Sequence, residues 1–178
     1  TRAAGGRSAW AAFEYAARHG YPSVTLCDKW GVMNETASLL LDAATEAAAG
    51  HPDIEFRTSQ VDSQMMWLTR KPEEFGVLLC SSFVGDVLSD GFAGLVGGLG
   101  FTPCANLGPQ CAVFEPVHGS APKYAELDPP IVNPIAAILA GAMLLDHLGE
   151  ERKAERIRSA VARVVREGVV RTFDMLEI

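Results

Sequence analysis

Residues 82–100, SFVGDVLSDGFAGLVGGLG, and residues 112–134, AVFEPVHGSAPKYAELDPPIVNP, decide how this 178-residue chain folds. The first segment places Asp86 and Asp90 one helical turn apart, so both carboxylates lie on one face and can share one hard cation. The second segment holds a loop at 118–123 whose backbone N–H groups and cationic side chains suit an anionic ligand. Taken singly, each feature also fits an ordinary solvated helix face or a hydrogen-bonded loop.

Outside these segments, short apolar runs alternate with helix-like patterns. The continuous apolar run at 76–82 predicts a buried strand, and Asn133 followed by Pro134 predicts the start of a helix. That helix is apolar nearly all round, so we expect it to be buried. The expected strands are 24–28, 54–61, 76–82 and 112–116, and the expected helices are 7–19, 34–49, 62–70, the stretch from 134, and 150–167. Strand followed by helix, repeated along the chain, predicts an α/β fold.

The composition excludes several classes of function. The chain is 48% hydrophobic and 21% charged, which predicts a packed core. Its net charge of −7 disfavours a nucleic-acid or anionic-membrane surface, and no apolar run reaches the roughly 18–20 residues that span a bilayer. The four cysteines lack the CxxC spacing of zinc sites and fit a reducing, cytoplasmic location. The opening TRAAGGRSAW has neither an initiator Met nor a signal-peptide core, so we expect a fragment or a processed chain.

Several motifs together resemble one family. TRAAGGRSAWAAFEYA, CDKWGVMNET and PDIEFRTSQVD occur in that order before the two segments quoted above. The chain resembles the second half of the isocitrate/isopropylmalate dehydrogenase family, and looks most similar to its NADP-dependent isocitrate dehydrogenase-like members. The resemblance implies a two-domain α/β fold that is incomplete here, with residues 1–95 in a small dimerisation and metal-site domain and residues 96–178 in a large dinucleotide-binding domain. The family's first half carries the arginines that grip the substrate carboxylates.

The resemblance also assigns catalytic and metal-binding roles. Lys29, in CDKWGV, falls on the family's catalytic lysine, which takes the proton of the substrate hydroxyl as a general base. Asp62, in SQVD, falls on a metal-site aspartate that the family contributes across a dimer interface. Asp86 and Asp90, in VGDVLSD, fall on the other two aspartates of that site. Three carboxylates suit Mg²⁺ or Mn²⁺. Taken alone, Asp62 also fits the N-cap of a helix.

A dinucleotide loop follows in the second segment. By resemblance, the cofactor-binding residues are Glu115, His118, Gly119, Ser120, Ala121, Lys123, Tyr124 and Asn133. Asn133 falls on the residue that binds adenine. Members that use NAD tend to have Asp where Lys123 stands, and the pair of Lys123 and Tyr124 is the one seen in NADP-dependent members. A cation and a phenol can hold a 2′-phosphate, so we expect NADP, with NAD as the alternative.

Two functions are compatible with these residues. The first is a metal-dependent oxidoreductase that oxidatively decarboxylates a 2-hydroxy acid, isocitrate first and 3-isopropylmalate second, as a homodimer or together with an N-terminal half. The second is a non-catalytic or regulatory subunit, or a truncated remnant, that dimerises without turnover. Trp30 and Gly31 favour the non-catalytic function, because the family usually has Ala-Asn at these positions. Ser82 favours it too, because an Asn is common there. Glu177 stands about where some members have an NADP-binding arginine.

Overall fold

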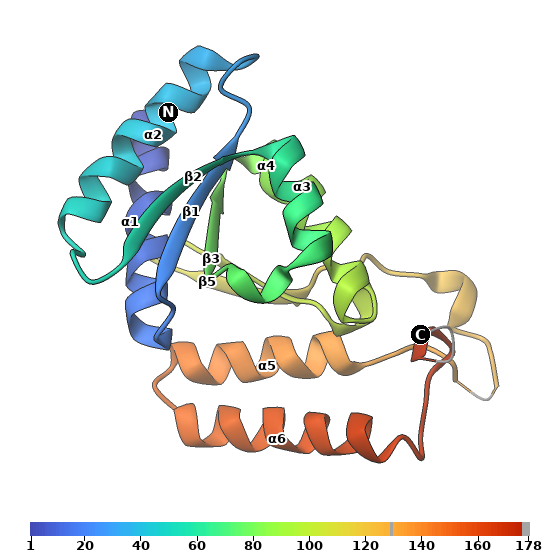
Figure 1. Ribbon diagram of the computed structural model, residues 1–178. Coiled ribbons are helices and arrows are strands. Elements are labelled where there is room, and N and C mark those ends of the chain that lie inside the picture. Colours follow the sequence, from blue (N-terminus) through green and yellow to red (C-terminus); the bar gives the residue numbers. More distant parts are fainter. Residues whose placement is uncertain (129, 176–178) are drawn as a thin grey trace. The chain divides into compact units, whose positions relative to one another are not determined.

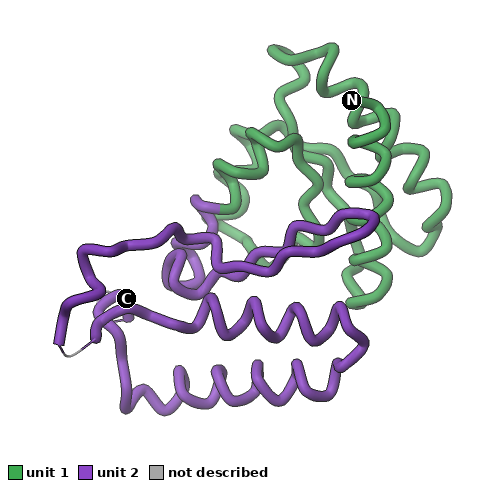
Figure 2. The backbone as a smooth tube through the Cα atoms, turned by 180° about the vertical axis from the view of Figure 1, so that it is seen from behind, with its two compact units in different colours: residues 1–89 green, residues 90–178 purple. Residues whose placement is uncertain are grey.

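The computed structural model describes residues 1–128 and 130–175, so Glu177 lies outside the described part of the chain. The chain forms two compact units, Thr1–Ser89 and Asp90–Ile178 (Figure 2). The boundary lies inside helix α4 (Ser82–Ala93). The proposed roles of residues 1–95 and 96–178 as a metal-site domain and a dinucleotide-binding domain stay predictions.

Unit 1 is a three-stranded parallel sheet in the order β2-β1-β3. Figure 1 shows α1 and α2 on one side of this sheet and α3 and α4 on the other. All six residues of β1 are buried, as expected for a central parallel strand that is covered on both faces. Before α4, the unit contains α1 (Arg2–His19), β1 (Ser23–Asp28), α2 (Asn34–Ala49), β2 (Glu55–Gln60), α3 (Val61–Arg70) and β3 (Val77–Cys80).

The hydrophobic core of unit 1 lies between α1, α2 and the sheet. Phe13 of α1 is fully buried against β1 residues Val24 and Leu26, and Leu79 of β3 continues the same cluster. Packing of Val24, Leu26 and Leu79 against the helices supports the observed register, because a shift by one residue would turn these side chains to the opposite face. That register brings the carboxyl ends of β1, β2 and β3 to the same edge of the sheet.

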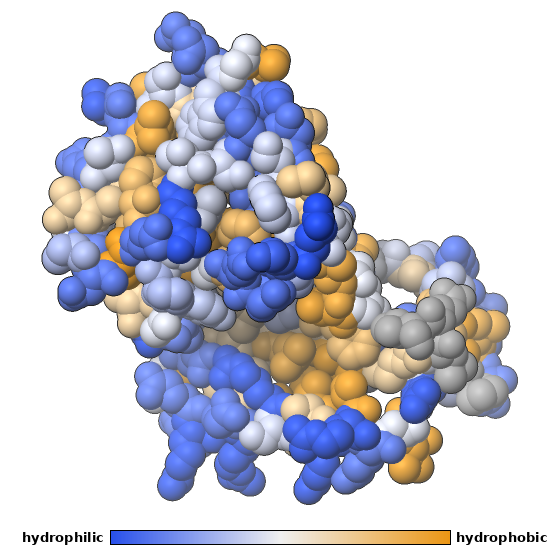
Figure 3. Space-filling model, viewed as in Figure 1, coloured by the Kyte–Doolittle hydropathy of each residue, from blue (hydrophilic) through white to orange (hydrophobic). Residues whose placement is uncertain are grey.

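Unit 2 is built on an antiparallel hairpin of β4 (Pro103–Leu107) and β5 (Ala112–Pro116), with α5 (Ile135–His147) and α6 (Glu151–Glu167) packed nearby. The predicted strand at 112–116 is confirmed, whereas β4 has no counterpart among the predicted strands. Short 3₁₀ turns occupy Gly94–Val96, Leu99–Phe101, Pro122–Tyr124 and Phe173–Met175. Figure 3 shows hydrophilic side chains covering the outer side of α6.

Several sequence expectations differ from the structure. The strand expected at 76–82 spans only Val77–Cys80, and of its four residues only Leu79 is buried. The helix expected from residue 62 begins at Val61, so Asp62 lies in its first turn and Gln60 is the N-cap. The first helix begins at Arg2 rather than at residue 7, because Thr1 accepts a hydrogen bond from the Ala4 N–H and caps it. Helix α5 is not buried all round: Ile138 is 43% and Leu144 41% exposed. No helix among the described residues combines the length and the apolar character needed to cross a membrane.

Candidate functional site

The pair Lys29–Asp62 lies at the carboxyl edge of the sheet in unit 1. Lys29 directly follows β1, and Asp62 is the second residue of α3, which directly follows β2. Because Asp28 and Gln60 are register partners at the carboxyl ends of β1 and β2, the residues that follow these two strands lie close together. The Lys29 Nζ atom lies 2.8 Å from Asp62 Oδ1. The hydrogen bond from Lys29 is the main cause that holds the pKa of the Asp62 carboxyl below its ordinary value.

The buried carboxylate of Asp28 holds the backbone of Lys29, and it was not identified from the sequence. Asp28 is 1% exposed, and its Oδ1 atom accepts a hydrogen bond of 2.7 Å from the Lys29 backbone N–H. Its Oδ2 atom is buried without a hydrogen-bond partner among the described residues. The available signal was a carboxylate placed as the last residue of an otherwise uncharged, buried strand, since such groups are rarely buried without a role. Asp28 fixes the backbone that presents Lys29.

The two remaining predicted metal ligands, Asp86 and Asp90, lie on α4 at i and i+4. Both residues are exposed, and neither carboxylate has a hydrogen bond or ion pair to the part of the chain that the structure describes. They are free oxygen donors of the kind that Mg²⁺ and Mn²⁺ prefer. Among residues 1–128 and 130–175, however, no three His, Cys, Asp or Glu side chains gather closely enough to hold a metal ion. The donor chemistry fits such an ion, while the predicted third ligand, Asp62, is engaged by Lys29.

Two cysteines lie close to the Lys29–Asp62 pair. Cys27 of β1 and Cys80 of β3 are register partners on adjacent strands, and neither forms a disulfide. The hydrogen bond with Cys80, together with burial, raises the pKa of the Cys27 thiol far above its ordinary range. A thiol that stays protonated is a poor nucleophile, so Cys27 fills space in the sheet, as its apolar sequence context predicts.

Trp30 and Ser82, the two unusual residues near the predicted site, have local structural roles. The Trp30 indole is half-buried and packs against the hydrophobic core of unit 1, and Ser82 is the first residue of α4. Gly31 is exposed, and its surroundings leave open space where a side chain would be.

The predicted dinucleotide loop lies within unit 2. Glu115, on β5, accepts a hydrogen bond of 2.9 Å from Asn106 Nδ2 on the neighbouring strand. The His118 Nδ1 atom lies 3.0 Å from the Gly119 carbonyl oxygen, which can only accept, so Nδ1 carries the proton in this contact. Gly119, Ser120 and Ala121 are exposed. The loop therefore presents its backbone to solvent with few bonds to the rest of the protein.

The end of this loop is fastened more firmly. Lys123 Nζ lies 4.7 Å from the centre of the Tyr124 ring, which in turn contacts the Phe173 ring at 6.0 Å. Asn133 is 4% exposed, and its Oδ1 atom accepts a hydrogen bond of 3.0 Å from the Ile135 N–H at the start of α5. This bond explains why the helix begins where the Asn-Pro signal predicts. The second bond of the Asn133 side chain goes to Asp174, at 2.9 Å.

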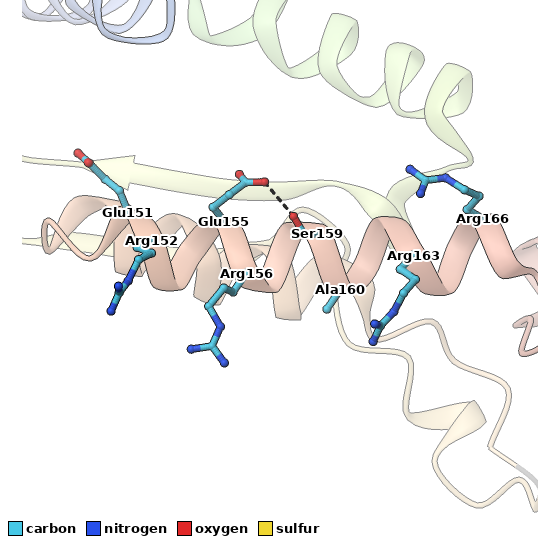
Figure 4. A pocket seen from close by; sticks show the side chains of 8 residues that line it. All are labelled: Glu151, Arg152, Glu155, Arg156, Ser159, Ala160, Arg163 and Arg166. Carbon is cyan, nitrogen blue, oxygen red and sulfur yellow. Dashed lines mark hydrogen bonds between the residues drawn. The ribbon is translucent and has the colours of Figure 1, made fainter.

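An open hollow of about 900 Å³ lies along α6, away from every predicted site residue in the sequence. Figure 4 shows Arg152, Arg156 and Arg163 on one side of the helix, and Glu151 and Glu155 on another. Arg166 points to the same side as the two glutamates, so basic side chains lie on both sides of the helix. Since one exposed helix lines the whole hollow, it is a surface depression rather than an enclosed substrate site.

Comparison with known proteins decides the family. The family model of isocitrate/isopropylmalate dehydrogenase matches residues 1–178. The chain belongs to the isocitrate/isopropylmalate dehydrogenase family. It is 39% identical over 170 residues to the 3-isopropylmalate dehydrogenase of Methanothermobacter thermautotrophicus, covering 96% of this chain and 51% of the relative. It is 46% identical over 158 residues to the isocitrate/homoisocitrate dehydrogenase of Thermus thermophilus, covering 88% and 46%.

The fold agrees with this assignment. The crystal structure of isocitrate dehydrogenase from Methylococcus capsulatus superposes with a TM-score of 0.92 at 44% identity, over 99% of this chain and 52% of the other. A mitochondrial NAD isocitrate dehydrogenase catalytic subunit of Arabidopsis thaliana is 42% identical over 176 residues, covering 98% of this chain and 46% of the relative. The chain thus spans about half the length of the curated relatives it matches. The predicted family and α/β fold are confirmed.

Proposed function

We propose that this chain supplies the C-terminal half of a β-decarboxylating dehydrogenase, an oxidoreductase that oxidises a 2-hydroxy acid, isocitrate first and 3-isopropylmalate second. The ion pair of Lys29 and Asp62 at the carboxyl edge of the sheet carries this proposal. A general base and a metal ligand have to lie within reach of one small substrate, and these two side chains are 2.8 Å apart. The edge of a parallel sheet is also where α/β enzymes place their sites.

The candidate catalytic and metal-binding residues have distinct roles in this proposal. In its neutral form, Lys29 takes the proton of the substrate hydroxyl at Nζ, and a cation held by the nearby aspartates would favour that neutral form. Asp62, Asp86 and Asp90 would hold Mg²⁺ or Mn²⁺. When bound, such an ion polarises the substrate hydroxyl and stabilises the negative charge that develops as the 3-carboxylate leaves as CO₂. Asp28 keeps the Lys29 backbone in place through its 2.7 Å hydrogen bond.

Unit 2 would bind the nicotinamide cofactor that accepts the hydride. Glu115 and residues 118–124 form the loop, and Asn133 closes its far end. Lys123 is exposed, so its charge is available to a 2′-phosphate, whereas an aspartate there would repel one. We therefore propose NADP, with NAD as the alternative that the name of the Arabidopsis relative illustrates.

The substrate site needs a second chain or a second half. Asp62 has a side chain 65% exposed, and the three aspartates do not form a cluster within the described residues. Ile138 and Leu144 leave apolar side chains of α5 uncovered, and a two-stranded hairpin is marginal by itself. These observations support a homodimer or association with an N-terminal half. By family resemblance, that half supplies the arginines that grip the substrate carboxylates, so we expect the 178 residues alone to oxidise no isocitrate.

A non-catalytic subunit or truncated remnant is the second candidate. Trp30 and Gly31 favour it, because Gly31 offers no side chain where the family usually has an asparagine. Such a protein would keep the fold and the dimer contacts without turnover. It would have no need for a working cofactor loop, so cofactor binding separates the two proposals.

The test is a thermal-shift titration of the purified chain with NADP⁺ and with NAD⁺, each with and without Mn²⁺. A ligand that binds only the folded state raises the unfolding temperature. We expect a shift with NADP⁺ that Lys123→Asp abolishes. Arg152→Asp is the matched control, because it makes the same charge change on the exposed face of α6. If neither cofactor shifts the transition, the non-catalytic alternative is favoured.

A further inference from the structure

The described C-terminal end of unit 2 forms a brace behind the predicted nucleotide loop. Its 3₁₀ turn, Phe173–Met175, contacts two points that are nine residues apart in the loop. Asp174 accepts the hydrogen bond from Asn133 Nδ2, and Phe173 packs on the ring of Tyr124. The bond between Asn133 and Asp174 joins residues 41 positions apart, so it ties the described end of the chain to the start of α5.

Asp174 fixes the orientation of the Asn133 amide. On one side of this amide lies the Ile135 N–H, which can only donate, so it has to meet the oxygen Oδ1. On the other side lies the Asp174 carboxylate, which can only accept, so it has to meet the nitrogen Nδ2. If the amide were flipped, it would lose both hydrogen bonds, although Asn133 is only 4% exposed and water could not replace them. The protein itself therefore orients Asn133 before any ligand binds.

Asp174 is itself held in place. The Thr172 hydroxyl donates to its Oδ1 atom, which leaves Oδ2 for Asn133. Gly100 packs against the same spot: a Cβ atom there would lie 2.6 Å from Asp174 Oδ2 and 3.0 Å from Asn133 Nδ2. A side chain at this position would therefore displace the Asp174 and Asn133 side chains from their present contact. Three segments of unit 2 thus converge on one carboxylate.

We propose that Asp174 is a positioning residue of the nucleotide site, acting through Asn133. This inference rests on the proposed cofactor function, because it assigns the brace to the adenosine side of NADP or NAD. The exposed loop at 119–121 has few internal bonds of its own. Holding its far end in one conformation lowers the cost of ordering it when the cofactor binds, which raises affinity without adding a contact to the ligand.

Two substitutions at one position separate positioning from bulk structure. Asp174→Ala removes the acceptor and frees the Asn133 amide, while Asp174→Asn keeps the shape and an oxygen that accepts from Nδ2. We expect Asp174→Ala to weaken NADP⁺ binding, measured by calorimetry on the 178-residue chain, by about tenfold, and Asp174→Asn by less than about threefold. Asp53→Ala, an exposed carboxylate of unit 1, is the matched control and should leave affinity unchanged.

A spectroscopic reading checks that the effect passes through Asn133. The side-chain NH₂ signals of Asn133, identified from the spectrum of Asn133→Asp, should move in Asp174→Ala and stay near their original positions in Asp174→Asn. If Asp174→Ala does not fold, Thr172→Val provides the milder change, because it removes only the hydroxyl that holds the carboxylate. For Thr172→Val we expect about threefold weaker binding.

The outcomes distinguish this inference from the proposed function. An unmodified chain that binds neither NADP⁺ nor NAD⁺ overturns the cofactor function and the brace together. If the unmodified chain binds NADP⁺ and folded Asp174→Ala or Thr172→Val binds it with unchanged affinity, only the positioning role of Asp174 is overturned. Equal losses in Asp174→Ala and Asp174→Asn would also overturn it, since the asparagine keeps the bond on which the inference depends.

Discussion

The two candidate regions of this molecule are held in place by different means. In unit 1, Lys29 and Asp62 follow strands of a parallel sheet whose central strand is wholly buried, so burial of the scaffold sets their positions. In unit 2, the hairpin is only partly buried, and the end of the loop is held by one hydrogen bond that the Asn133 amide donates to Asp174. The first region depends on packing and the second on hydrogen bonds, so different substitutions should damage each.

Gly76 gives the strongest test of the packed region. A Cβ atom at this position would lie 2.4 Å from the backbone oxygen of Ser23, so the start of β1 or the residue before β3 has to move. We expect Gly76→Ala to lower the free energy of unfolding of unit 1 by about 2–3 kcal/mol, because a backbone atom cannot rotate away as a side chain can. Urea unfolding followed by circular dichroism measures this change.

Gly6→Ala is the matched control for Gly76. The space around Gly6 is empty within 4 Å, and the residue lies in α1. Alanine favours the helix, so this variant should gain about 0.5–1 kcal/mol. If Gly76→Ala leaves the free energy of unfolding unchanged, the sheet tolerates movement at its edge. The contrast between the packed and the bonded region would then fail.

Gly100 tests the bonded region in the same way. Its added Cβ would meet Asp174 and Asn133 side chains, at 2.6 and 3.0 Å, and no backbone atom is among its nearest neighbours. Because side chains can yield, we expect Gly100→Ala to cost only about 1–2 kcal/mol in unfolding free energy while NADP⁺ affinity falls. Gly141→Ala, in α5 with open space around it, is the control that should keep affinity and, like Gly6→Ala, gain about 0.5–1 kcal/mol in stability. A stability loss without an affinity loss would contradict the role assigned to Asp174.

The elements that depend on neighbouring residues in the chain were predicted from the sequence. The apolar run before Asp28, the strand at 112–116 and the Asn-Pro start of α5 all appear where the patterns place them. Strand β4 was missed because it contains a proline and ends in a glycine turn, and only its pairing with β5 makes it a strand.

The residues that support the candidate site were missed for a related reason. Asp28 reads as the end of a strand, and its burial becomes visible only when the helices cover the sheet. Asp174 lies in a short segment without periodicity, and its partner Asn133 is 41 residues away. The motifs identify Lys29, Asp62, Asp86 and Asp90 as candidates by resemblance, but contacts at long sequence separation decide what holds such side chains, and one sequence does not encode those contacts in any local pattern.

The smallest expected effect concerns the Lys29–Asp62 pair itself. Its scaffold is packed, but the pair is open to water, so its removal should scarcely change stability. The titration of Asp62 is the sensitive measurement. Its folded-state pKa lies below the ordinary 3.8, with the Lys29 hydrogen bond as the main cause. The stabilisation is therefore complete above 3.8 and is lost as the pH falls through the folded pKa.

Carbon-13 NMR of the Asp62 carboxyl group measures that midpoint directly. Lys29→Met should raise the Asp62 pKa toward 3.8, because it removes the donor while keeping the length of the side chain. Lys71→Met, which removes an exposed lysine paired with Glu74, should leave the Asp62 midpoint unchanged. If Lys29→Met leaves it unchanged as well, the strand ends do not hold the two groups together in solution. The packed sheet would then position their backbones without positioning their charges, and the proposed site in unit 1 would depend on bound ligands as much as the loop in unit 2 does.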